Sequence, residues 1–301
     1  MIGPYNTSLA FRTALEARLR NISQSRGTDL QRLQRRVAFE RLLARLFAQD
    51  NPPWLLKGGC ALELRLERRA RSTRDLDISV PDPMCLQLLT EVGEDISCAQ
   101  TVYELVQQAA GQDLGDGFEF LIGQLEEMQT GAPRGGGRCH VDARLAGRTF
   151  VEFHLDIGLG DVVLGQSDWV EGSGLLAFAG IPAARVALYP IPQQFAEKVH
   201  AYSLPRQDRQ NTRVKDLADL VLLIHIEQPE VERVKQALRA TFETRNTHPL
   251  PTDLPEPPQT WAVPYADLAR ELELPALTLQ EAYAYLNAFW HKLELGQANE
   301  S

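Results

Sequence analysis

The chain has 301 residues, of which 44% are hydrophobic and 24% are charged, and its formal net charge is −9. This composition is typical of a globular protein, and the length allows a large core and two domains or lobes. No run of about 18 apolar residues occurs and the N-terminal segment has no apolar signal core, so we expect a cytoplasmic protein without a membrane span. The net acidity argues against a general nucleic-acid binder.

Four cysteines are present, and their spacing matches neither a C-x-x-C pair nor a zinc site. We therefore expect buried or incidental thiols in a reducing compartment. The four are Cys60, Cys85, Cys98 and Cys139.

Positive charge gathers in arginine-rich stretches of this acidic chain. Residues 11–45 hold nine arginines against three acids, and residues 65–74 hold five arginines against one acid. Such stretches fit either a solvated helix face or a local footprint for RNA, and both interpretations stay open at this point.

The first part of the chain predicts two helices and then a strand. Apolar residues recur at helical spacing over 8–22 and 28–48, and in the second helix the arginines lie opposite the apolar stripe. Two prolines at 52–53 end the helical region, because the residue before a proline disfavours the helical conformation. A short apolar strand over 54–57 follows.

A glycine pair comes directly after this strand. Gly58 and Gly59 can take backbone angles closed to other residues, and good helix formers fill 60–66. The backbone N–H groups that begin this helix therefore lie just past a tight turn, which is a ready place for a phosphate. A Gly-Gly turn alone is a weak signal of such a site.

The second strand, 75–80, alternates polar and apolar residues. Since side chains alternate faces along a strand, Asp75 and Asp77 project from one face while the residues between them enter the core. Two neighbouring carboxylates repel each other, and they are well suited to bind Mg²⁺ or Mn²⁺. Asp-x-Asp alone often occurs by chance, but its place after the glycine turn indicates phosphoryl or nucleotidyl transfer.

A hairpin with one polar face is predicted near the middle of the chain. Residues 139–145 and 151–157 each alternate apolar and polar side chains, with a glycine turn between them. The polar positions include Asp142, His154 and Asp156, which fit either a site or a solvated sheet face.

The other elements before residue 190 are less regular. Residues 84–108 predict a mostly helical segment, 118–122 a strand, and 158–190 an irregular or β-rich region. The glycine run at 135–137 predicts a flexible or tight connection.

A helix is predicted over 193–203. Its buried stripe comprises Phe195, Val199 and Tyr202, so Lys198 is expected to point elsewhere.

The helix that begins at residue 213 has a similar pattern. Asp216 and Asp219 lie off its apolar stripe. Further helices are predicted over 230–244, 265–272 and 277–293, with a proline-rich loop or linker at 249–264.

Two motifs in the central stretch resemble a known family. Residues 57–62 (KGGCAL), followed by residues 71–77 (RSTRDLD), resemble the AbiEii/AbiGii-type nucleotidyltransferase toxins, which include the mycobacterial MenT-like toxins. That family belongs to the DNA polymerase β-like nucleotidyltransferase superfamily. The resemblance returns at 192–201 and 213–221. The chain departs from the superfamily pattern at Gly59, where serine is favoured.

The resemblance implies a metal site. Asp75 and Asp77 would bind the metal ions, and an acid on a later strand would help to activate the attacking hydroxyl. Asp156 is the expected third carboxylate, with Asp142 and Asp161 as the alternatives.

The resemblance also implies nucleotide-binding residues. Lys198 would neutralise the triphosphate, and Asp216 would orient Lys198 or the nucleotide. Without the resemblance, Lys198 reads as a surface lysine and Asp216 as a first-turn carboxylate favoured by the helix dipole. The other candidates are Lys57, Gly58, Gly59, Arg71 and Thr73.

The implied fold is α+β with two lobes. Residues 1–190 would form a nucleotidyltransferase lobe with a mixed sheet that carries the carboxylates, and residues 191–301 would form a helical lobe that supplies Lys198 and Asp216. We expect the nucleotide in the cleft between them.

The implied function is that of a toxin in a toxin–antitoxin system. It would transfer nucleotides from a nucleoside triphosphate to the 3′ end of tRNA with Mg²⁺ or Mn²⁺, release pyrophosphate and block translation. A cognate antitoxin is the expected partner. Two alternatives stay open, namely a nucleotide- or RNA-binding module without turnover and a transferase that acts on a protein or small-molecule acceptor. The arginine-rich stretches favour RNA as the acceptor.

Overall fold

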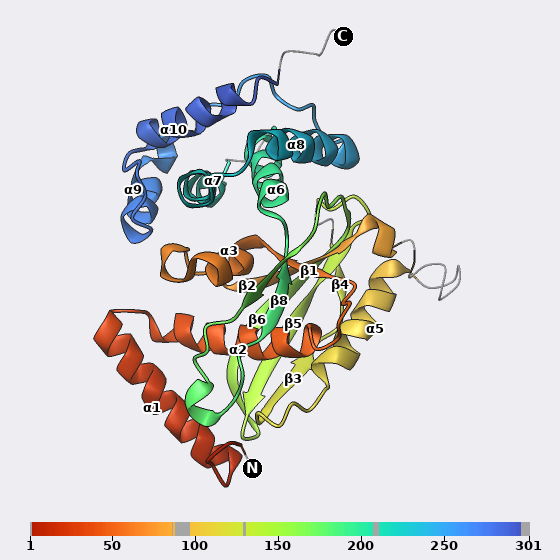
Figure 1. The fold of residues 1–301 in the computed structure, drawn as a ribbon, viewed down its shortest axis with the longest axis vertical. Helices are drawn as coiled ribbons and strands as arrows, with labels where there is room; N and C mark the ends of the chain where they lie inside the picture. The colour runs from red at the N-terminus through yellow and green to blue at the C-terminus, as the bar shows by residue number, and fades with distance from the viewer. Residues whose placement is uncertain (1, 86, 88–96, 129–130, 207–210, 296–301) are drawn as a thin grey trace. The chain divides into compact units, whose positions relative to one another are not determined.

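The computed structural model describes residues 2–85, 87, 97–128, 131–206 and 211–295 (Figure 1). The chain divides into two compact units by its internal contacts. The first, here called the sheet unit, comprises residues 1–67, 72–160 and 167–188. The second, here called the helical unit, comprises residues 68–71, 161–166 and 189–301.

The sheet unit is built on an eight-stranded mixed sheet with the order β3-β5-β6-β2-β1-β8-β7, and β4 pairs with β5. Strand β1 pairs antiparallel with β2 and parallel with β8, which places β2 and β1 in the middle of the sheet. The strands are β1 Leu55–Lys57, β2 Asp75–Pro81, β3 Phe118–Ile122, β4 Glu126–Glu127, β5 Gly136–Leu145, β6 Arg148–Asp161, β7 Asp168–Glu171 and β8 Arg185–Leu188.

Helices cover one face of this sheet. Phe39 of α2 packs edge-on against Phe153 of β6, with ring centroids 4.8 Å apart. Helix α5 packs against β3 (Figure 1). Thr7 and Asp29 cap the N-termini of α1 and α2 with their side-chain oxygens. The helices are α1 Ser8–Arg26, α2 Leu30–Leu46, α3 Gly58–Leu66 and α5 Cys98–Ala110.

In the helical unit, α7 packs against α6, α9 and α10, and α6 packs against α8 (Figure 1). The predicted proline-rich loop is tied to this bundle, since Tyr202 donates to the carbonyl of Pro255 at 2.6 Å and Trp290 to that of Thr252 at 2.9 Å. The helices are α6 Ile191–Ser203, α7 Val214–Glu227, α8 Val231–Arg245, α9 Ala262–Glu271 and α10 Leu279–Lys292.

The predicted α+β class, with a mixed sheet and a helical C-terminal part, is confirmed. All four cysteines are free and buried, as expected. Among the helices of the described residues, none is long and apolar enough to cross a membrane.

The glycine run at 135–137 differs from the predicted connection. Gly136 and Gly137 belong to β5, where Gly137 pairs with Ile157 of β6. A side chain at Gly137 would overlap the packed side chain of Leu125, so glycine lets the two segments approach. Of the predicted helix over 84–108, residues 86 and 88–96 lie outside the described residues.

Two arginines predicted on the solvated side of the second helix are buried instead. Arg41 and Arg45 both bind the buried Asp116, with Nε of Arg41 2.7 Å from Oδ2 and Nη2 of Arg45 2.8 Å from Oδ1. Helix α2 is covered on more than one side, and Asp116 compensates the two charges. These two residues are therefore not part of a basic surface.

Candidate active site

Strand β2 carries the predicted carboxylate pair between β6 and β1. Leu76 and Ile78 are fully buried, whereas Asp75 and Asp77 are partly exposed. The alternation therefore presents both carboxylates on one face of the sheet, as predicted. Lys57 lies directly opposite Asp77 in the β1–β2 pair, so these two side chains share that face.

The glycine turn lies against this pair. Gly58 has φ +67°, a left-handed conformation that side chains other than glycine rarely adopt, and it begins helix α3. A Cβ at this position would overlap the carboxylate of Asp77. The carboxylate therefore sits at the N-terminus of α3, where backbone N–H groups and the helix dipole favour negative charge.

Replacing Gly58 with alanine tests this close approach. We expect Gly58→Ala to displace the Asp77 carboxylate and lower the rate of the predicted nucleotidyl transfer by at least about tenfold, because the predicted metal ligand would lose its alignment. Gly147→Ala is the matched control, since Gly147 has φ +69° but nothing within 4 Å of an added Cβ. The control should cost about 1–2 kcal/mol of unfolding free energy and keep its activity. Equal activities of the two variants would contradict the expected role.

Asp156 lies on the same face as the pair. His154, two residues before it on β6, places Nδ1 3.5 Å from Oδ1 of Asp75. Because side chains two apart share a strand face, Asp156 projects toward the side that carries Asp75. Asp156 is bound by Arg138 of β5, its direct cross-strand partner, through two bonds of 2.6 Å from Nε and Nη2.

The charges of this face act on one another. The hydrogen bond to Asp156 raises the pKa of Arg138 above its usual range, and the negative charges of Asp156, Asp75 and Asp77 raise it further. Within the part of the chain that the structure describes, no three His, Cys, Asp or Glu side chains gather closely enough to hold a metal ion. Asp156 is turned to Arg138 instead.

The two alternatives for the third carboxylate are each bound by a different arginine. Asp142 projects from β5 and receives a 2.6 Å bond from Nε of Arg144. Asp161 belongs to the helical unit, where it is buried and 2.8 Å from Nη2 of Arg245. His154 places Asp156 on the face that carries Asp75, and the choice of Asp156 as the third carboxylate stays a prediction.

Lys198 lies in a buried ion cluster of the helical unit, which we call the Lys198 cluster. Its Nζ is 2.5 Å from Oδ2 of Asp219 and 3.2 Å from Oδ1 of Asp216. Arg71 completes the cluster, with Nη2 3.0 Å from Oδ2 of Asp219. The predicted contact between Asp216 and Lys198 is therefore present, whereas the central acid, Asp219, is a residue that the sequence analysis did not select.

The cluster is electrostatically balanced. Burial lowers the pKa of Lys198, but the charges of Asp219 and Asp216 outweigh it and raise that pKa. Burial likewise raises the pKa of Asp219, but Lys198 and Arg71 outweigh it and lower that pKa. Lys198 and Asp219 are thus both charged at neutral pH, although both are buried.

One expectation about these helices was wrong, namely that Lys198 points away from the buried side of its helix. Phe195, Val199 and Tyr202 form the buried stripe of α6, but Lys198 is buried as well. Asp216 and Asp219 lie off the apolar stripe of α7 and are nevertheless buried. The reason is that α6 and α7 each pack against more than one neighbouring helix, so side chains beside the main stripe are also covered.

Thr73 and Arg71 were predicted to bind nucleotide, and both have partners within their own units. The Thr73 hydroxyl donates to the backbone carbonyl of Asp75 at 3.2 Å, and the residue is buried. This bond fixes the entry into β2. Arg71 binds Asp219, as described above, so both predictions stay untested.

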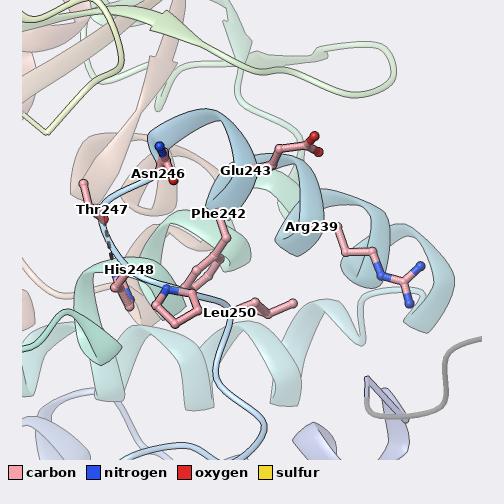
Figure 2. A pocket seen from close by; sticks show the side chains of 8 residues that line it. Arg239, Phe242, Glu243, Asn246, Thr247, His248 and Leu250 are labelled. Atoms are coloured by element: carbon pink, nitrogen blue, oxygen red, sulfur yellow. Dashed lines mark hydrogen bonds between the residues drawn. The ribbon is translucent and has the colours of Figure 1, made fainter.

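A separate cavity of about 540 Å³ lies in the helical unit between α8 and the segment that follows it (Figure 2). Figure 2 shows the hydrogen bond between Thr247 and His248, which measures 3.0 Å. Thr247 also contacts Nε2 of the buried His200 at 2.8 Å. The residues predicted to form the active site do not line this cavity.

His200 beside this cavity should make stability sensitive to acid. Burial, with the nearby positive charge of Arg245, lowers its pKa from 6.5 to about 3. Between about pH 6.5 and pH 3 the unfolded chain therefore binds a proton at His200 that the folded chain does not bind. The free energy of unfolding accordingly decreases as the pH is lowered through this window. His200 alone contributes up to about 1.4 kcal/mol per pH unit. Urea unfolding of His200→Gln should show a shallower pH dependence, and an unchanged slope would contradict this.

Comparison with known families shows the family of this chain. The family described as "Nucleotidyl transferase AbiEii toxin, Type IV TA system" matches residues 41–293, which include the Asp75–Asp77 strand and helices α6 and α7. The chain belongs to this family. It is a nucleotidyltransferase toxin of a type IV toxin–antitoxin system, which confirms the resemblance drawn from the motifs.

The fold of this AbiEii-family chain is similar to that of a solved toxin structure. MenT4, a nucleotidyltransferase toxin from Mycobacterium tuberculosis H37Rv, aligns with a TM-score of 0.60 and 17% identity. The alignment covers 95% of this chain and 91% of that chain, and at this identity it shows a shared fold. No curated protein matches the chain by sequence.

Proposed function

We propose that this toxin transfers a nucleotide from a nucleoside triphosphate to the 3′ end of tRNA and releases pyrophosphate, which would block aminoacylation. The observation that supports a nucleotidyl transfer is the Asp75–Asp77 pair on β2, set against Gly58 at the start of α3. The proposed protein partner is the cognate antitoxin.

The carboxylates fit a divalent cation. Asp75 and Asp77 project from one strand face and offer hard oxygen ligands, which suit Mg²⁺ or Mn²⁺, with Asp156 as the proposed third ligand. When bound, the ion would stabilise charge on the phosphate and lower the pKa of the attacking hydroxyl.

The chain's own residues would carry the remaining chemistry. The 3′-hydroxyl oxygen attacks the α-phosphorus, the bond to the β-phosphate bridging oxygen breaks, and pyrophosphate leaves. Asp156 accepts the hydroxyl proton. Gly58 and Gly59 at the start of α3 provide a favourable place for phosphate charge, and Lys57, opposite Asp77, adds a cation on the same face.

We further propose that Lys198 binds the triphosphate with Asp216 as its positioning partner. Lys198 stays protonated because Asp219 and Asp216 raise its pKa. A fixed ammonium group of this kind can stabilise phosphate charge. The MenT-like family resemblance supports this role.

The tRNA acceptor can be tested through its 3′ end. Wild-type protein, Mg²⁺ and an α-labelled nucleoside triphosphate are incubated either with tRNA or with tRNA whose terminal ribose has been oxidised by periodate. We expect label in the intact tRNA and none in the oxidised tRNA. Equal labelling of both would rule out the 3′ end as acceptor. Triphosphate binding without any transfer would instead favour a binding module.

A further inference from the structure

Arg138 lies beside the proposed metal ligands without being one of them. It belongs to β5, faces Asp156 directly across the β5–β6 pair, and binds both carboxylate oxygens of Asp156 at 2.6 Å. Its side chain is about one-third exposed, at 34%. Arg138 therefore reaches the carboxylate face while remaining accessible to solvent and ligand.

The contact puts Arg138 in competition with a metal ion. Both oxygens of Asp156 are engaged by the guanidinium, and Asp75 and Asp77 lie near enough for their charges to act on it. Arginine does not lose its proton in proteins, so it can release a carboxylate only by moving away. A divalent cation on the same oxygens would face the positive charge of Arg138 at short range.

A triphosphate offers Arg138 another anion. A guanidinium binds phosphate oxygens with the same two-pronged geometry that it uses for a carboxylate. Exchange of Asp156 for a phosphate would therefore preserve the hydrogen bonds of Arg138 and free both oxygens of Asp156.

We propose that Arg138 holds Asp156 away from the metal in the nucleotide-free protein and moves to the triphosphate when nucleotide binds, which releases Asp156 to the metal. This inference rests on the proposed function. Arg138 is a positioning residue for Asp156, and it couples metal binding to nucleotide binding. The metal should bind weakly alone and more tightly together with a nucleotide.

The coupling can be measured without turnover by titrating the full-length protein with Mn²⁺ and following free Mn²⁺ by electron paramagnetic resonance. Without nucleotide, Arg138→Gln should bind Mn²⁺ about tenfold more tightly than wild type, the scale of one charge-assisted interaction. In an Asp156→Asn background the same substitution should change the affinity less than about threefold. Equal effects in both backgrounds would overturn the inference, because Arg138 would then act only as a nearby charge.

Arg144→Gln is the matched control. Arg144 lies on the same strand and binds Asp142 at 2.6 Å. Its substitution therefore removes an arginine–aspartate pair of the same kind that does not include Asp156. It should leave the Mn²⁺ affinity unchanged, and a gain equal to that of Arg138→Gln would overturn the inference. Thermal unfolding of each variant verifies the fold.

A second readout uses an α,β-methylene nucleoside triphosphate at saturating Mn²⁺. Arg138→Gln should bind this analogue about tenfold more weakly than wild type, and unchanged binding would overturn the inference. If wild type binds Mn²⁺ with the analogue, and Arg138→Gln has the same affinities as wild type for both Mn²⁺ and the analogue, only the inference about Arg138 fails. If neither wild type nor the Arg138 variant binds Mn²⁺ with the analogue, the metal-dependent function fails as well.

Discussion

Asp77→Asn is expected to lower the rate of nucleotidyl transfer by about 10³-fold or more while leaving the fold intact. Asp77 contacts the start of α3 and projects toward the proposed metal site. A metal ion contributes several kcal/mol to transition-state stabilisation, and each 1.4 kcal/mol corresponds to about tenfold in rate. Single-turnover transfer of α-labelled nucleotide measures the effect, and circular dichroism confirms folding.

The matched control is Asp142→Asn. Asp142 is an acid of the neighbouring hairpin whose partner is Arg144, so the substitution removes a carboxylate from the same sheet without touching the pair on β2. Its transfer rate should stay within about threefold of wild type. A folded Asp77→Asn protein with wild-type activity would remove the carboxylate pair from the mechanism.

Asp219→Ala is expected to lower the free energy of unfolding by about 3–5 kcal/mol. Asp219 is fully buried and bound by both Lys198 and Arg71, so its removal leaves two cations with fewer counter-ions in a dry environment. Asp216, which is 3.2 Å from Lys198, compensates only part of this charge. Equilibrium urea unfolding measures the loss.

The corresponding control is Asp267→Ala, which removes an exposed acid paired with Arg270 on α9. Exposed pairs are worth little, so this variant should stay within about 0.5 kcal/mol of wild type. A loss below 1 kcal/mol for Asp219→Ala would mean that water reaches the Lys198 cluster and that Asp219 does not hold it together.

Strand β2 and the β5–β6 hairpin could be predicted from the sequence because strict alternation decides which side chains are buried. Leu76, Ile78 and Phe153 are buried and Asp75 and Asp77 share one face, as their spacing requires. The placement of the carboxylates on the sheet therefore followed from local pattern alone.

Contacts between distant segments could not be predicted in this way. Asp219 meets Lys198 because α6 and α7 pack together, and an analysis of one helix at a time assigns both residues to an uncovered side. Arg138 was not selected because the strand was expected to begin at Cys139. Arg138 lies opposite Asp156 because β5 begins at Gly136, before the predicted strand, and this start is known only from the packed structure.

The most direct test of nucleotidyl transfer follows the α-phosphate and the γ-phosphate of the triphosphate separately. Wild-type protein and Asp77→Asn are incubated with Mg²⁺, tRNA and the same triphosphate labelled at either the α- or the γ-phosphate. We predict that wild type places the α-label in tRNA and releases the γ-label as pyrophosphate in equal amounts, while Asp77→Asn does neither. Recovery of the γ-label in the acceptor, or transfer without pyrophosphate, would contradict nucleotidyl transfer at this site.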